Sequence, residues 1–170
     1  MSQAAKLADR FSRELDGDDP FAYNETASVS VLASAAACSG FLALAEFATT
    51  KRAARDRRQK ARGRSDFWMM GDGRAWAFEF KQITGGGITS RRLDRKMTAA
   101  IDCAKSIHER DANMAVAGLI VSLSYFEPAE AATARKVLSD FKNERDFAWK
   151  IGSRDKEQET YLFFDVAWRK

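Results

Sequence analysis

The chain has 170 residues, of which 45% are hydrophobic and 31% charged, so it is long enough for one domain (residues 1–170) with a packed core. This composition argues against a wholly disordered chain. Cys38 and Cys103 lack metal-ligand spacing and are expected to be reduced thiols. His108 is the single histidine, and no nucleophile elbow accompanies it, which argues against a Ser-His-Asp hydrolase.

Two helices are predicted first. Apolar residues at helical spacing indicate a helix over residues 2–15, which an acidic turn with Pro20 ends. Asn24 is a suitable N-cap for a second helix, which should run to Ser39 with Gly40 at its end. An alternative is a membrane span, because residues 26–45 carry no charge, but this stretch is rich in Ala and Ser. The first twenty residues contain no apolar segment typical of a secretory signal, so we expect a cytoplasmic protein.

Three strands are predicted next. Residues 41–48 read as a strand, although their alanines would also suit a continued helix. A basic loop follows, and then two apolar runs over 65–71 and 75–83 surround Asp72-Gly73, which is typical of a hairpin.

The remaining elements alternate. A glycine joint at residues 85–87 precedes an amphipathic helix over 89–110, and the apolar run 115–124 indicates a buried strand. Pro128 suits the first turn of another helix, and residues 161–168 close the chain as a strand. The expected fold is a mixed α/β domain of element order ααβββαβαβ, with a central mixed sheet of about five strands flanked by helices.

The hairpin carries the strongest chemical signal. Strand side chains alternate between faces, so Glu79 and Lys81 share one face while Phe78 and Phe80 occupy the other. Burying a carboxylate and an ammonium in an aromatic strand is costly. Asp66 on the neighbouring strand would bring a second carboxylate to the same point, and Ala75 and Ala77 on that face would leave room. This pattern predicts a metal site with a lysine beside it.

Ser65-Asp66 followed by Glu79-Phe80-Lys81 resembles the motif of the PD-(D/E)XK nuclease superfamily, with Ser65 where many members have proline. The resemblance implies a restriction-endonuclease-like core over about residues 24–125. The helix at 2–15 and the helix and strand over 128–168 would be additions to it.

The resemblance also implies a catalytic site. Mg²⁺ or Mn²⁺ would be held by Asp66, Glu79 and the backbone carbonyl of Phe80, with Lys81 orienting or deprotonating water or stabilising charge. The helix before the first strand often supplies a further acid in this family. Glu25 is the position that matches, with Glu46 as the competitor if residues 41–48 continue the helix.

Basic residues are concentrated in one segment. Residues 51–64 hold eight basic side chains and one acidic one. Because the whole chain has a net charge of +4, the rest of the chain has a net charge near −3. Such a cluster indicates a polyanion partner, DNA before RNA, and a solvated loop without a partner is the alternative. The candidate phosphate contacts are Arg52, Arg55, Arg58, Arg62 and Arg64, with a second cluster at Arg91, Arg92, Arg95 and Lys96.

The expected function is a metal-dependent nuclease that hydrolyses DNA phosphodiester bonds and possesses no membrane partner. Dimerisation would allow cleavage of two strands, although no dimer surface can be identified from the sequence. A nuclease fold that binds nucleic acid without cleaving it is the first alternative. A membrane-tethered or structural protein is the second.

Overall fold

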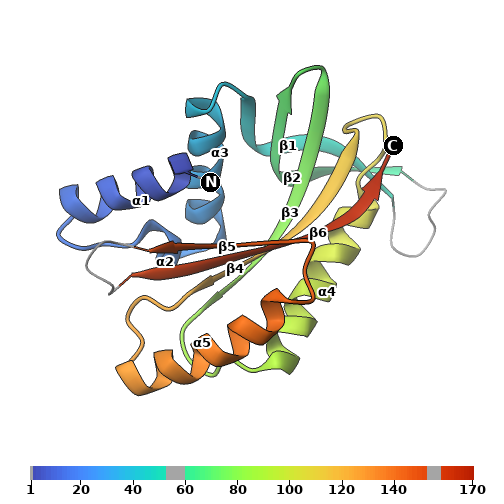
Figure 1. The fold of residues 1–170 in the computed structure, drawn as a ribbon. Helices are drawn as coiled ribbons and strands as arrows, with labels where there is room; N and C mark the ends of the chain where they lie inside the picture. The colour runs from blue at the N-terminus through green and yellow to red at the C-terminus, as the bar shows by residue number, and fades with distance from the viewer. Residues whose placement is uncertain (1, 53–59, 153–157) are drawn as a thin grey trace.

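A six-stranded mixed sheet of order β1-β2-β3-β4-β6-β5 runs through the protein, with helices against both faces (Figure 1). The computed structural model describes residues 2–52, 60–152 and 158–170. Only β3 and β4 pair in parallel, and every other neighbouring pair is antiparallel. The strands are β1 (Leu42–Arg52), β2 (Lys60–Gly71), β3 (Arg74–Thr84), β4 (Met114–Ser122), β5 (Phe147–Gly152) and β6 (Glu159–Arg169).

The helices divide between the two faces. Three helices precede the sheet along the chain: α1 (Ser2–Glu14), α2 (Pro20–Tyr23) and α3 (Glu25–Cys38). Two more follow, α4 (Ser90–Ser106) after β3 and α5 (Pro128–Lys142) after β4. In Figure 1, α1 and α3 lie on one side of the sheet and α4 and α5 on the other. Asn24 begins α3 by accepting a hydrogen bond from the Ala27 N–H at 2.9 Å, as an N-cap does.

The mixed α/β class is confirmed, but the predicted number of strands is wrong. The described part of the chain forms six strands, because residues 147–152 pair with β6 as an edge strand. Phe147 and Trp149 of β5 are partly exposed, so this strand lacks the buried apolar run that marks β4. The short α2 was also not predicted. Asp19 caps it by accepting a hydrogen bond from the Phe21 N–H at 2.9 Å.

Residues 41–48 do not continue the helix. Gly40 adopts a left-handed φ of 89°, and the chain then enters β1. The prediction of a basic loop is wrong at both ends of the segment. β1 runs on to Arg52 and β2 begins at Lys60, and these two residues are register partners. Antiparallel pairing provides hydrogen-bond partners for the backbone N–H and C=O groups, and this stabilises the strands although few side chains here are apolar. Arg55 and Arg58 lie outside the described residues, as does the side chain of Arg52.

Each face of the sheet buries its own hydrophobic cluster. On the α1 and α3 face, Phe78 and Phe80 pack with Phe67 and Phe164, as the alternation along β3 predicts. The Phe80 ring covers the backbone of Gly118 in β4, where an added Cβ would overlap it. On the opposite face, Ala75 and Ala77 are buried under α4. The room that these two alanines were expected to leave is therefore filled by the helix and not by a ligand.

Candidate active site

The candidate site lies where β2 separates from β3. The ladder between the two strands ends at the pair Phe67 and Phe78, and the next residues on each strand are Asp66 and Glu79. Asp66 Oδ2 accepts a hydrogen bond from the Phe80 N–H at 2.7 Å, so this carboxylate satisfies a backbone donor that has lost its strand partner. The fully buried Ser65 donates its hydroxyl to the Phe78 carbonyl at 2.9 Å. These bonds fix Ser65 and Asp66, the first half of the motif, to β3, which carries the second half.

Glu79 is a buried carboxylate, with 3% of the residue exposed. Lys51 Nζ lies 2.8 Å from its Oε1 and forms an ion pair with it. Burial raises the pKa of Glu79 to about 7, and the negative charge of Asp66 adds to this, while Lys51 and Lys81 oppose it. The Lys51 ammonium thus occupies the position that a metal cation bound to Glu79 Oε1 would take.

Lys81 lies between carboxylates at the edge of the site. Its Nζ is 3.3 Å from Glu25 Oε1 and donates a hydrogen bond to the Phe80 carbonyl at 2.5 Å. Burial lowers the pKa of Lys81, but the charges of Glu25 and Asp66 together outweigh burial, and the net pKa is raised. Lys81 is therefore an ammonium at neutral pH. It can stabilise negative charge or orient water, but in this state it cannot accept a proton.

The structure separates the two acids proposed to complete the site. Glu25, in the first turn of α3, reaches Lys81. Glu46 sits on β1 and pairs with Arg64 at 3.3 Å, with both side chains largely exposed. The condition that favoured Glu46, a helix through residues 41–48, is not met. Glu25 is thus the acid that contacts the motif.

The residues present suit a magnesium ion only in part. Among the described residues, no group of three or more acidic, histidine or cysteine side chains could hold a metal ion. Mg²⁺ needs only one or two carboxylates when waters and substrate phosphates complete its shell, and Asp66 with Glu79 provides two. The Phe80 carbonyl already accepts a hydrogen bond from Lys81, so it could become a ligand only after that ammonium moves. Asp66 and Glu79 would therefore supply only part of the ligand set that the ion needs.

Two neighbours of Glu79 were not predicted as parts of the site. Lys51 was counted only among the basic residues, and Cys103 of α4 only as a reduced thiol. Burial and then the charge of Glu79 raise the pKa of the Cys103 thiol, which keeps it protonated and unsuited to be a nucleophile. Lys51 reaches Glu79 by passing over Gly63, where a Cβ would overlap the lysine stem. The absence of a side chain at Gly63 is the one feature of the sequence that could have indicated this contact.

The end of the β1–β2 hairpin is held against the C-terminal end of α4. The His108 N–H donates to the Thr50 carbonyl at 3.1 Å, and Asp111 accepts from the Thr50 N–H at 2.8 Å. Lys51 forms an antiparallel bridge with Ile107. These contacts place Lys51 beside Glu79, although 28 residues separate the two along the chain.

The candidate phosphate contacts are not equivalent. Arg62, Arg64, Arg91 and Arg95 are exposed, and Lys96 is half-buried. Arg92 Nη1 instead donates to the carbonyls of residues 85–87, including that of Gly86, and so ties the glycine joint to α4. Nη1 of Arg92 is therefore engaged within the protein, and a phosphate contact by this residue would use the other donors of its guanidinium group.

Comparisons with protein-family models, with curated proteins and with solved structures give no match. Within the described ranges, no helix combines the length and the apolar character that crossing a membrane requires.

Proposed function

We propose that this protein is a metal-dependent nuclease with a restriction-endonuclease-like core, and that it hydrolyses DNA phosphodiester bonds. The order α3-β1-β2-β3-α4-β4 supports the proposed core, because the resemblance implies a helix, three strands, a helix and a strand. One observation carries the proposal: Asp66 and Glu79 meet where β2 leaves β3, and the Lys81 ammonium lies beside them.

The reaction adds water across one phosphorus–oxygen bond of DNA. Asp66 and Glu79 would hold Mg²⁺, which when bound polarises the phosphodiester and favours hydroxide over water. Lys81 remains an ammonium and offers positive charge to the phosphate oxygens as negative charge develops on them. Glu25 holds Lys81 in place through the 3.3 Å ion pair. It acts on the reaction through Lys81 and is a positioning residue.

The test is cleavage by purified protein of supercoiled, linear, single-stranded and branched DNA, and of RNA, in Mg²⁺, Mn²⁺ or EDTA. Cleavage should require the divalent ion and should be lost in Asp66→Asn and Glu79→Gln. Glu46→Gln is the matched control, because it removes a carboxylate of β1 whose ion-pair partner among the described residues is Arg64. Full activity of Glu79→Gln would exclude this site.

A second candidate is a nuclease fold that binds nucleic acid without cleaving it. The position of Lys51 favours this candidate, because its ammonium lies 2.8 Å from a proposed ligand oxygen of Glu79. Such a module would bind DNA with the same salt dependence but would show no cleavage with Mg²⁺ or Mn²⁺. Replacing Lys51 would not restore cleavage in that case.

A further inference from the structure

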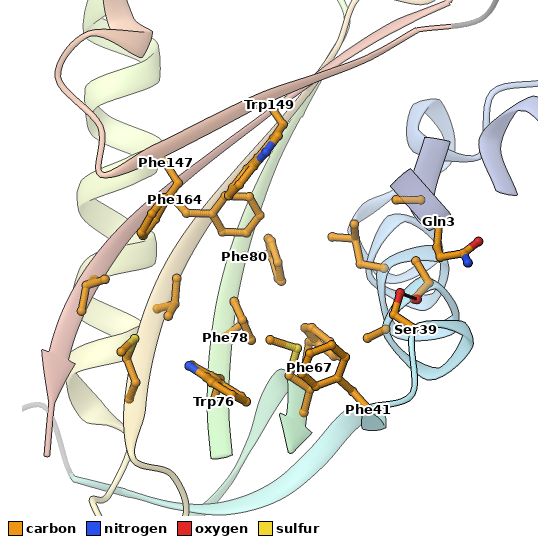
Figure 2. Close-up of a pocket in the computed structure, with 18 of the residues that line it drawn as sticks. Gln3, Ser39, Phe41, Phe67, Trp76, Phe78, Phe80, Phe147, Trp149 and Phe164 are labelled. Carbon is orange, nitrogen blue, oxygen red and sulfur yellow. Dashed lines mark hydrogen bonds between the residues drawn. The ribbon is translucent and has the colours of Figure 1, made fainter. Parts of the chain in front are cut away.

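A cavity of about 440 Å³ lies between α3 and the sheet, on the face opposite to Glu79 (Figure 2). Aromatic residues make up more than half of the sheet side of the cavity, and most of the others are Met and Val. Figure 2 shows Phe78 and Phe80 on the sheet with Trp149 beyond them, and Phe41 beneath α3. Leu32, Ala35 and Ala36 of α3 line the opposite wall.

The composition of α3 explains why this space exists. Its second half, residues 33–38, consists of Ala, Ser and Cys, so no long side chain reaches from this half of the helix toward the aromatic rings. Protein interiors are packed densely enough that voids much larger than a water molecule are few. This space is partly open to solvent, since Phe147 and Trp149 in its lining are exposed, and its apolar walls lack part of the contacts that dense packing would give them. Its volume falls in the range of small-molecule sites, about 300–1,000 Å³.

One end of the cavity carries an unpaired positive charge. The strand registers place Trp76, Met114 and Arg169 in one row across β3, β4 and β6. Arg169 is exposed and makes no ion pair or hydrogen bond through its side chain with any other described residue. Within the described ranges, no aspartate or glutamate lines the cavity. A ligand that fits would therefore be apolar over most of its length and negatively charged at one end.

We propose that this cavity binds a small amphiphile with an apolar body and a single anionic group. The apolar body lies between α3 and the aromatic face of the sheet, and the anionic group pairs with Arg169. The site is independent of the proposed nuclease activity, because Phe80 and Glu79 are neighbours on β3 whose side chains point to opposite faces.

The experiment uses octanoate as the probe and displacement of the fluorescent anion 1-anilinonaphthalene-8-sulfonate as the readout. Octanoate should displace the dye, octan-1-ol should do so less well, and octyltrimethylammonium should be weakest because it brings a like charge to Arg169. Arg169→Ala should weaken octanoate binding about tenfold and leave octan-1-ol binding unchanged. Equal affinity for octanoate and octyltrimethylammonium would overturn the proposal.

A matched pair of variants on α3 tests the location. Ala35 is buried and lines the cavity, whereas Ala37 is exposed on the same helix. Ala35→Leu should abolish dye and octanoate binding and preserve the melting temperature, and Ala37→Leu should change neither. Unchanged octanoate binding in a folded Ala35→Leu protein would place the site elsewhere. Sedimentation should show octanoate binding to a monomer. A dimer that loses dye binding as it forms would show that a second copy covers the cavity, and would also overturn the proposal.

Discussion

Lys51 and Glu79 form a partly buried ion pair that joins the edge strand β1 to the inner strand β3. The 2.8 Å between Lys51 Nζ and Glu79 Oε1 places an ammonium where a divalent ion would sit. Glu79 is much the more buried partner, with 4% of its side chain exposed against 25% for Lys51. The lysine can therefore withdraw into solvent, whereas the carboxylate cannot.

Lys51→Met should raise the affinity for Mg²⁺ or Mn²⁺ at pH 8, because the variant removes the cation that competes for Glu79. Isothermal titration calorimetry measures this, and a few-fold gain or more is expected. Lys6→Met is the control, since Lys6 is exposed on α1. A loss of affinity in Lys51→Met would show that the lysine supports the metal site and does not compete with the ion.

Stability should depend on pH through Glu79. Its pKa is about 7 in the folded protein against an ordinary 4.5, so the folded state holds this proton more tightly than the unfolded state. The resulting stabilisation is full below about pH 4.5 and is lost as the pH rises through about 7. The shift corresponds to about 3 kcal/mol. Urea melts of wild type and Glu79→Gln should therefore differ increasingly from pH 4.5 to 7, with wild type losing stability relative to the variant. Parallel curves would contradict the raised pKa.

Lys81→Ala should reduce cleavage about 10²-fold if the protein is a nuclease, because it removes a charge that stabilises the transition state. Lys81→Arg should recover part of the activity, since a guanidinium also supplies positive charge. Single-turnover rates at saturating DNA give the comparison, with Lys105→Ala on the exposed surface of α4 as control. Equal rates for Lys81→Ala and wild type would exclude a role for this residue in the chemistry.

Gly118→Ala should destabilise the protein by about 1–3 kcal/mol, because the new Cβ overlaps the ring of the fully buried Phe80. Phe80→Leu should be destabilising alone, but it should make Gly118→Ala less costly when the two are combined. Urea denaturation of the four proteins of this cycle measures the coupling. Strictly additive effects would show that the ring and the glycine do not meet.

Arg62 and Arg64 should supply sequence-independent affinity for DNA. Replacing both with alanine should weaken binding to all sequences alike and should flatten the slope of log K against log salt by about two units, because two phosphate contacts release fewer counterions. Fluorescence anisotropy across a salt series measures this. Arg10→Ala with Arg13→Ala on α1 is the control pair, since these arginines pair within their own helix. An unchanged slope would move the phosphate contacts to the second cluster, Arg91, Arg92, Arg95 and Lys96.

The sequence by itself determined most of the elements and the two faces of β3. Helical spacing, the Asn24 cap and the apolar run of β4 are local signals, and each reflects short-range hydrogen bonding or side-chain periodicity. The same alternation predicted that Glu79 and Phe80 face opposite ways. β5 was not predicted. It is an edge strand that pairs only with β6 and is little buried, so its residues show no strong apolar pattern.

Only the tertiary structure decided which side chains surround Glu79. Lys51 meets it because the β1–β2 hairpin reaches the end of α4, and Glu25 reaches Lys81 because α3 begins beside β3. Both contacts join residues at least 28 positions apart, so they cannot be predicted from the periodicity of side chains along the chain. The cavity beside α3 is likewise a feature that only the tertiary structure decided. The sequence shows the small residues of the helix and the aromatic residues of the sheet, but not the distance between them. The unfilled space between them depends on how far apart the packed backbone holds the two elements.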